Sequence, residues 1–298
     1  MELRVLQYFL AVAREQNITA AAESLFLSQP TLSRQLKDLE NELGKQLFIR
    51  GKRQITLTEE GMLLRKRAEE IMQLVKKAED EISLPDAVIA GDITVGAGET
   101  DGMRILAKAV NALQKEHPLI HFHIVSGDKV NVIEDLDRGL IDFGLLFGPV
   151  DTSKYECIPI PYQDTWGVLM RKDSPLAKKT SITANDLWDK PLIISRQAFK
   201  SGELRDFFAN EHEKLNIVAT YNLIYNGSLM VDEGIGYALC FDKLVYAMGE
   251  SGLCFRPLSP TVEAKPSLVW KKYQVFTKAT SLFLQKLREN IGEHSLQS

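Results

Sequence analysis

The sequence is short of cysteine and has no long apolar segment. Its three cysteines, Cys157, Cys240 and Cys254, are odd in number and widely spaced, so they do not indicate a disulfide framework. No apolar run approaches the roughly 20 residues that a membrane-spanning helix needs. Residues 1–4 lead directly into a patterned helix and lack the layout of a secretory signal. We therefore expect a cytoplasmic protein with reduced, mostly buried thiols and no membrane partner.

The chain also lacks an excess of positive charge, with a formal net charge of −4 at pH 7. It is therefore not expected to bind nucleic acid through its bulk charge. Between residues 29 and 53, however, basic residues outnumber acidic ones, which fits one small module that docks on DNA. A length of 298 residues exceeds what a single core usually supports and predicts two or three domains.

Residues 28–44 carry the strongest helical pattern. Ser28 is suited to cap the helix, Pro30 lies in the first turn where a missing N–H costs little, and Gly44 is suited to end it. An apolar stripe recurs every three or four residues and consists of Leu32, Leu36, Leu39 and Leu43. The first turns of the other face carry polar and basic side chains, which are the residue types that read base edges and bind phosphate.

The flanking residues predict a helix-turn-helix with a wing. An amphipathic helix over residues 3–17 is followed by a short one over 19–26, capped by Thr19, and two residues separate it from the next helix. Residues 47–58 form two β-prone runs around a glycine, which predicts a hairpin. We assign base contacts to Gln29, Thr31, Ser33 and Arg34, in the turn that contains Pro30. Contacts to phosphate or the minor groove are assigned to Ser28, Lys37, Arg50, Lys52 and Arg53.

A long run of positions between residues 21 and 61 stands in a fixed register. These positions are Ala21-Ala22, Leu25, Ser28-Gln29-Pro30, Leu32-Ser33, Gln35, Leu39-Glu40, Leu43-Gly44, Leu47-Phe48, Arg50, Leu57-Thr58 and Gly61. The run resembles the winged helix-turn-helix of LysR-type transcriptional regulators, with Glu60 as a departure where alanine is usual. The resemblance implies an all-α N-terminal domain that binds double-stranded DNA as a dimer on an interrupted dyad, one recognition helix per major groove.

Residues 59–86 predict one long helix. Apolar residues with spacing 4, 3, 4, 3, 4 form an a/d seam of Leu64, Ala68, Ile71, Val75, Ala78 and Ile82. The seam fits a helix that pairs two protomers, and it also fits an ordinary helix packed on its own chain. The family resemblance favours pairing and implies a homotetramer. Pro85 is expected to end the helix and to mark a domain boundary.

The remaining residues alternate between strand and helix patterns. Strands are expected at 92–98, 122–125 and 143–147, with helices at 103–117 and 132–140 between them, which predicts a parallel sheet with right-handed crossovers. After a strand at 165–170 the theme repeats, with strands at 192–195 and 217–224 and helices at 202–212 and 228–233. A strand at 266–270 and a helix around 282–291 are expected to return to the first lobe.

Three runs in this part look like the effector domain of the same family: Gly139 with Asp142-Phe143-Gly144-Leu145, Asp173-Ser174-Pro175-Leu176-Ala177, and Val231 with Gly234-Ile235-Gly236-Tyr237-Ala238-Leu239. Ser126 and Cys240-Phe241 depart from the usual pattern. The resemblance implies an α/β effector domain of two lobes, built like a periplasmic binding protein. We expect domains at 1–58, 59–86 and 87–298, with lobe 1 at about 87–161 and 265–298 and lobe 2 at about 162–264.

A ligand cleft is expected where strands end and helices begin, because backbone N–H groups and helix dipoles gather there. The candidate effector-binding residues are Thr100, Asp101, Gly127, Lys129, Phe147, Arg196, Lys200, Ser201, Asn226 and Ser228. Thr100 and Ser201 match positions that often hold effector hydroxyl contacts in the family. Each candidate could equally serve only to cap its own helix.

The charges of these loops point in two directions. Lys129, Arg196 and Lys200 suggest an effector that carries a carboxylate. Glu99 and Asp101, together with Asp128, argue against a plain anion pocket.

Enzyme and metal motifs are weak. Gly96-x-Gly98-x-x-x-Gly102 lacks dinucleotide-binding spacing, and no nucleophile, base and orienting group form a set. His121 and His123, with His117 nearby, have no further ligand pattern, so we expect no metal, cofactor or catalytic residue. The sequence thus predicts a DNA-binding regulator that responds to a small molecule, with RNA polymerase as a candidate partner. The alternatives are a solute-binding protein and, less favoured, an enzyme acting on a small acid.

Overall fold

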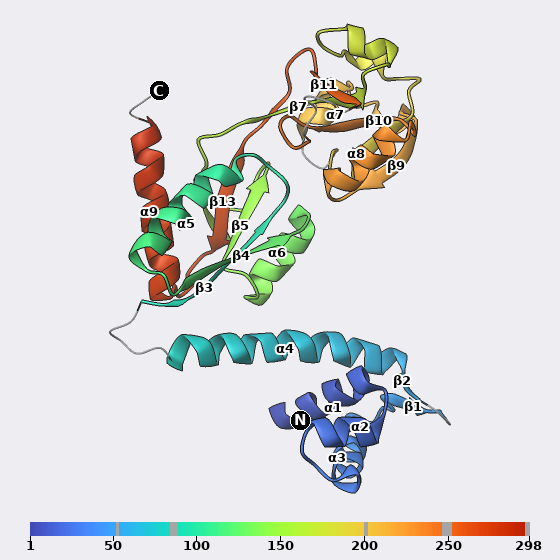
Figure 1. Cartoon of the computed structure of the whole chain (residues 1–298), viewed down its shortest axis with the longest axis vertical. Coiled ribbons are helices and arrows are strands. Elements are labelled where there is room, and N and C mark those ends of the chain that lie inside the picture. The colour runs from blue at the N-terminus through green and yellow to red at the C-terminus, as the bar shows by residue number, and fades with distance from the viewer. Residues whose placement is uncertain (52–53, 84–88, 200–201, 246–251, 296–298) are drawn as a thin grey trace. The chain divides into compact units, whose positions relative to one another are not determined.

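The computed structural model describes residues 1–51, 54–83, 89–199, 202–245 and 252–295. The chain forms two compact units, Met1–Ser83 and Leu84–Ser298 (Figure 1). Within the described residues, no helix is both long and apolar enough to cross a membrane. The described cysteines are unpaired, with Cys240 and Cys254 buried and Cys157 exposed.

The first unit contains the expected helix-turn-helix and wing. Its elements are α1 (Leu3–Glu15), α2 (Ile18–Ser24), α3 (Gln29–Leu43), β1 (Phe48–Arg50), β2 (Ile55–Leu57) and α4 (Glu59–Ser83). β1 and β2 pair antiparallel, with Phe48 opposite Leu57. The cap expected at Thr19 is wrong: α2 is capped by Asn17, whose Oδ1 accepts the N–H groups of Thr19 (2.8 Å) and Ala20 (3.2 Å).

One apolar core holds this unit together. Leu32, Leu36 and Leu39 of α3 are buried in it, and each contributes about 1.5–3 kcal/mol by leaving water. The rings of Phe9 on α1 and Phe48 on β1 lie 5.1 Å apart and join the helices to the wing. Leu43 is 41% exposed, so the predicted stripe ends one turn early.

The predicted seam of α4 is divided between two uses. Ala68 is fully buried, and Leu64 and Ile71 pack partly against the core of their own unit. The first half of the seam therefore stabilises its own chain, which agrees with the interpretation of α4 as an ordinary helix packed on its own chain. Large apolar residues that stay exposed on α4 are Met62, Leu63, Leu74 and Ile82. Pro85, expected to end the helix, lies outside the described residues.

The second unit contains two sheets, each with its helices. The first lobe has a five-stranded sheet in the order β4-β3-β5-β13-β6. Its elements are β3 (Gly91–Ala97), α5 (Met103–Glu116), β4 (Ile120–Ser126), α6 (Lys129–Arg138), β5 (Phe143–Phe147), β6 (Tyr155–Pro159), β13 (Pro266–Lys271) and α9 (Lys278–Ser295). β3 runs parallel to β4 and β5, as predicted, and β13 joins the sheet antiparallel to β5 and β6. With β13 the chain returns to this sheet after the second sheet.

Alternation along the strands covers both faces of this sheet. Leu145 and Leu268 pack in the cluster that contains α5 and α9, whereas Leu146 and Val269 pack in the cluster that contains α6. Neighbouring strand residues point to opposite faces, so buried runs such as Phe143–Phe147 need a helix layer on each side.

The second lobe has a sheet in the order β11-β7-β10-β8-β9, with β12 paired to β7. Its strands are β7 (Asp164–Arg171), β8 (Leu192–Ser195), β9 (Ile217–Tyr221), β10 (Tyr237–Phe241), β11 (Leu253–Pro257) and β12 (Glu263–Ala264). Its helices are α7 (Gly202–Phe207), α8 (Ile224–Asp232) and the 3-10 turns η1 (Pro175–Lys178), η2 (Ala184–Asp186) and η3 (His212–Lys214).

Several element limits differ from the sequence prediction. β9 ends at Tyr221 rather than residue 224, and α8 begins at Ile224 rather than residue 228. α7 ends at Phe207, five residues early, and α6 begins at Lys129, three residues early. The limits of α8 matter most, because they move two predicted ligand residues into the body of a helix.

Candidate DNA-binding surface and effector cleft

Helix α3 presents a polar face opposite its buried leucines. Ser28 caps it: its Oγ accepts the N–H of Thr31 (3.3 Å) and lies 2.7 Å from the Thr31 hydroxyl. Gln29, Thr31, Arg34 and Lys37 are exposed, and Ser33 is half-buried. Arg34 lies 3.9 Å from the Asp38 carboxylate with its side chain 84% exposed. Such a surface pair is worth little, so it does not withhold the guanidinium from a ligand.

The wing is tied to this helix by a contact that the sequence did not suggest. Glu40 Oε1 accepts the backbone N–H groups of Leu47 (2.8 Å) and Phe48 (3.2 Å). The acidic half of α3 thus orients the base of the hairpin. Of the residues assigned to phosphate, Lys52 and Arg53 lie outside the described residues, and only the backbone of Arg50, the last residue of β1, is described.

A cavity of about 170 Å³ lies between the two lobes of the second unit. It is lined from the first lobe by residues that include Gly98, Glu99, Lys129 and Phe147, and from the second lobe by residues that include Trp166, Gln197 and Phe241. Three rings pack together along its wall: Phe241 lies 4.9 Å from Phe147 and 4.4 Å from Trp166, between ring centroids. The cavity is therefore mainly apolar, with an aromatic wall and a few polar groups, as ligand sites usually are.

Among the described residues, two hydrogen bonds cross between the lobes at this cavity, and each caps a helix. The Glu99 carboxylate, from the loop after β3, accepts the N–H of Ile224, the first residue of α8. Conversely, Gln197 Oε1 of the second lobe accepts the N–H of Lys129, the first residue of α6, at 2.9 Å. Burial raises the pKa of the Glu99 carboxyl, and the hydrogen bond from Ile224 opposes that shift.

The structure brings only some of the predicted effector residues to the cavity. Gly127, Lys129 and Phe147 line it. The Lys129 ammonium donates to the carbonyl oxygens of Phe147 (3.1 Å) and Pro149 (2.6 Å), so it stabilises the loop after β5. Arg196 is exposed beside the lining residues Ser195 and Gln197.

Asn226 and Ser228 are not at a helix start, as expected, but inside α8. Ser228 is buried, and its hydroxyl donates to the Tyr225 carbonyl at 2.7 Å. Neither residue is among those that line the cavity. Lys200 and Ser201 lie outside the described residues.

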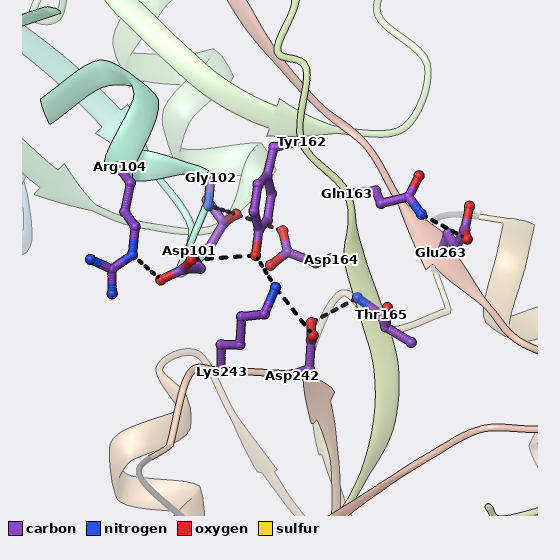
Figure 2. Close-up of polar contacts among 11 residues, drawn as sticks. Asp101, Gly102, Arg104, Tyr162, Gln163, Asp164, Thr165, Asp242, Lys243 and Glu263 are labelled. Carbon is purple, nitrogen blue, oxygen red and sulfur yellow. Dashed lines mark hydrogen bonds and ion pairs between the residues drawn. The ribbon is translucent and has the colours of Figure 1, made fainter. Parts of the chain in front are cut away.

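Thr100 and Asp101 lie in a polar cluster at the crossing between the lobes. Figure 2 shows this cluster around Asp101 and Asp164. The Thr100 hydroxyl donates to Asp164 Oδ2 at 2.5 Å and accepts the N–H of Gly102 at 2.9 Å. Asp101 Oδ1 accepts from Arg104 Nε at 2.7 Å. Both candidate side chains are thus engaged within the protein, and neither is among the residues that line the cavity.

The cluster continues into the second lobe. The Tyr162 hydroxyl donates to Asp101 Oδ2 (3.4 Å) and accepts from Lys243 Nζ (2.9 Å), which also lies 3.6 Å from Asp242 (Figure 2). Asp164 is fully buried, and burial raises its pKa to about 6. These contacts join the start of β7 to both lobes, so they are placed to respond to any change in the lobe angle.

The described residues contain no cluster suited to a metal ion. His123 Nε2 and His121 Nδ1 both face Asp92 Oδ1, at 3.1 and 3.6 Å, on the exposed edge of the first sheet. No group of three or more His, Cys, Asp or Glu side chains in the described part of the chain could hold a metal. Burial raises the pKa of the Cys240 thiol to about 12, which makes it a poor nucleophile.

A winged helix-turn-helix joined to a two-lobed unit with a cavity between its lobes defines a DNA-binding regulator with a small-molecule domain. Residues 3–62 match the family described as "Bacterial regulatory helix-turn-helix protein, lysR family", and residues 87–292 match the "LysR substrate binding domain". The chain belongs to the LysR family of transcriptional regulators. The match of residues 3–62 removes the alternative of a solute-binding protein.

Individual relatives agree with this assignment. The Hca operon transcriptional activator HcaR of Escherichia coli (strain K12) is 30% identical over 279 residues, which cover 91% of this chain and 92% of HcaR. The HTH-type transcriptional regulator BsdA of Bacillus subtilis (strain 168) is 40% identical over 221 residues, which cover 73% and 74% of the two chains. Full-length CbnR, solved with its target DNA, has a similar fold with a TM-score of 0.76 at 22% identity, covering 97% of this chain and all of CbnR.

Proposed function

We propose that the chain binds an interrupted dyad beside a promoter as a dimer, with one α3 helix in each major groove. The observation that carries this proposal is the division of α3 into two faces. Leu32, Leu36 and Leu39 fix the helix in the core, while Gln29, Thr31 and Arg34 stay exposed on its first turns. A rigid helix with a free polar face is what base reading in the major groove requires.

The residue roles follow from position in the sequence of α3 and of the wing that comes after it. Gln29, Thr31, Ser33 and Arg34 contact bases, and Pro30 holds the first turn that presents them. Ser28, Lys37, Arg50, Lys52 and Arg53 contact phosphates or the minor groove. A role at chromosomal DNA supports a cytoplasmic location, with RNA polymerase as a candidate partner at the neighbouring promoter.

Pairing of two copies through α4 sets the spacing of the two recognition helices. Because Leu64, Ala68 and Ile71 pack on their own chain, the pairing surface consists instead of the exposed residues Leu63, Leu74 and Ile82. Buried apolar area of this kind drives helix pairing in water. A homotetramer then forms by association of two such dimers.

The cavity between the lobes holds a small-molecule effector that changes the grip on DNA and is not turned over. The hydrogen bonds from the Ile224 N–H to Glu99 and from the Lys129 N–H to Gln197 depend on the angle between the lobes. A ligand shifts that angle only if it binds one arrangement more tightly than the other. Since Lys129 is engaged with carbonyl oxygens and Arg196 does not line the cavity, the proposed effector is not restricted to carboxylates.

A mobility-shift titration on the DNA next to the protein's own gene tests the proposal. At fixed salt, Arg34→Ala should weaken binding by roughly 1–3 kcal/mol, about 5- to 150-fold, if Arg34 reads a base. The matched control is Arg14→Ala, which removes an exposed arginine from α1 in the same unit. Arg14→Ala should leave the affinity within about twofold, because surface substitutions away from a site change little.

Equal losses in the two variants would mean that Arg34 acts only through net charge. Unchanged binding in Arg34→Ala would remove α3 as the reading element. Turnover of a small molecule by the full chain would contradict the assignment of the cavity to effector binding.

A further inference from the structure

The size and lining of the interlobe cavity limit what can occupy it. Its volume is about 170 Å³, close to that of an apolar cavity of about 150 Å³ that holds one benzene molecule. The ring cluster of Phe147, Trp166 and Phe241 supplies a wall against which a flat apolar group can pack. One aromatic ring with a short substituent therefore fits the cavity.

The polar end of the cavity is acidic. Glu99 lines it and is half-buried, so its carboxylate has lost much of its hydration. Its Oε2 accepts the Ile224 N–H, and no other residue in the described part of the chain donates a hydrogen bond to Glu99. A carboxylate has room for several donors, which leaves Glu99 able to accept one from a ligand.

The ammonium group and the two helix N-termini that would attract an anion at this cavity are already engaged, whereas the indole N–H of Trp166, a neutral donor, has no partner among the described residues. The N-terminus of α8 is capped by Glu99 itself, and the N–H of Lys129 at the start of α6 is bonded to Gln197. The Lys129 ammonium donates to two backbone carbonyl oxygens. A ligand carboxylate would therefore meet the Glu99 carboxylate at short range, where like charges repel strongly in a partly dehydrated site.

We propose that the effector is a small single-ring aromatic molecule with an amino or hydroxyl donor, which packs on Phe147, Trp166 and Phe241 and donates to the Glu99 carboxylate. An ammonium group gives the strongest contact, because it combines the hydrogen bond with opposite charge. This assignment rests on the proposed role of the cavity as the effector site. It replaces the carboxylate effector that the cations of the sequence suggested.

The test compares probes that share one ring and differ in the polar group: benzylamine, benzyl alcohol and benzoate. Dissociation constants are measured on the full chain by ligand-detected NMR titration at pH 7. Benzylamine should bind at least about tenfold more tightly than benzoate, with benzyl alcohol between them.

Glu99→Gln separates charge from shape. The glutamine carbonyl can still accept the Ile224 N–H, while its amide N–H now offers a donor to the cavity. Benzylamine should therefore lose about tenfold and benzoate should gain, so that the order of the probes inverts. Glu134→Gln, which removes one exposed charge from α6 of the same lobe, should change neither constant.

Tighter or equal binding of benzoate by the unaltered chain would overturn the proposal, as would no detectable benzylamine binding at millimolar concentration. An unchanged probe order in Glu99→Gln would overturn it too. DNA binding without probes is scored separately. If Arg34-dependent binding persists while the probe order fails, only the effector class is wrong; if that binding is absent, the regulator assignment itself fails.

Discussion

Replacing Asp164 by asparagine should change how stability depends on pH. The carboxyl is fully buried at the crossing between the lobes, with Oδ2 bonded to the Thr100 hydroxyl and Oδ1 unpartnered among the described residues. Burial and the nearby Asp242 raise its pKa to about 6 from the usual 3.8. The folded state therefore keeps this proton up to about pH 6, while the unfolded chain releases it near pH 4.

Between these two values the folded state binds more protons, so this group makes stability fall as pH rises. At 1.36 kcal/mol per pKa unit the difference amounts to roughly 3 kcal/mol, fully expressed by pH 7. An asparagine side chain does not ionise, so the Asp164→Asn variant does not lose this stability as the pH rises. The stability of the variant minus that of the unaltered chain should therefore increase by about 2 kcal/mol from pH 4 to pH 7, because part of the loss is already expressed at pH 4.

Urea unfolding followed by tryptophan fluorescence measures this difference, because Trp166, Trp188 and Trp270 all lie in the unit Leu84–Ser298. Any unpartnered amide in the variant adds a constant that does not depend on pH. As a control, Asp173→Asn should show the opposite sign with a small size, because Arg171 lowers the pKa of that exposed carboxyl. A pH-independent difference for Asp164→Asn would refute the reasoning.

Two further substitutions probe the first unit. A Cβ on Gly61 would lie 2.2 Å from the Leu47 carbonyl oxygen, so Gly61→Ala should destabilise the unit by about 1–3 kcal/mol in urea unfolding followed by circular dichroism. The control Gly292→Ala, where the added Cβ meets open space, should not destabilise the protein. Equal stabilities of the Gly61→Ala variant and the unaltered chain would show that α4 does not approach Leu47 so closely. Leu74→Glu places a charge on the proposed pairing surface and should shift the full chain toward monomer in sedimentation analysis, while the exposed control Lys76→Glu should not. An unchanged mass of the Leu74→Glu variant would exclude this face of α4 from pairing.

The parts of the fold governed by local signals were predictable. Ser28, Pro30 and Gly44 act within their own helix, and the limits of α3 follow from them. The Thr19 prediction failed because Asn17, one residue before the helix, offers the better acceptor for the first N–H groups. Such errors stay within one turn and do not change the fold.

The ligand site was predicted less well because its determinants lie far apart in sequence. The start of α8 carries no local cap; Glu99, which caps it, is separated from Ile224 by 125 positions. The sequence pattern therefore predicts the start of the helix at the next polar residues, Asn226 and Ser228. Thr100 likewise has the expected position, but its hydroxyl bonds to Asp164, 64 positions away. Glu99 stood out in the sequence only as a charge that argued against an anion pocket.

Footprinting of the full chain on the DNA beside its own gene measures whether α3 reads an interrupted dyad. We expect two protected half-sites related by a dyad, with centres about 10–10.5 base pairs apart or a multiple of that distance. Both should require higher protein concentration in Arg34→Ala and stay unchanged in Arg14→Ala. A single protected site, or protection without sequence preference that the two variants reduce equally, would contradict this expectation.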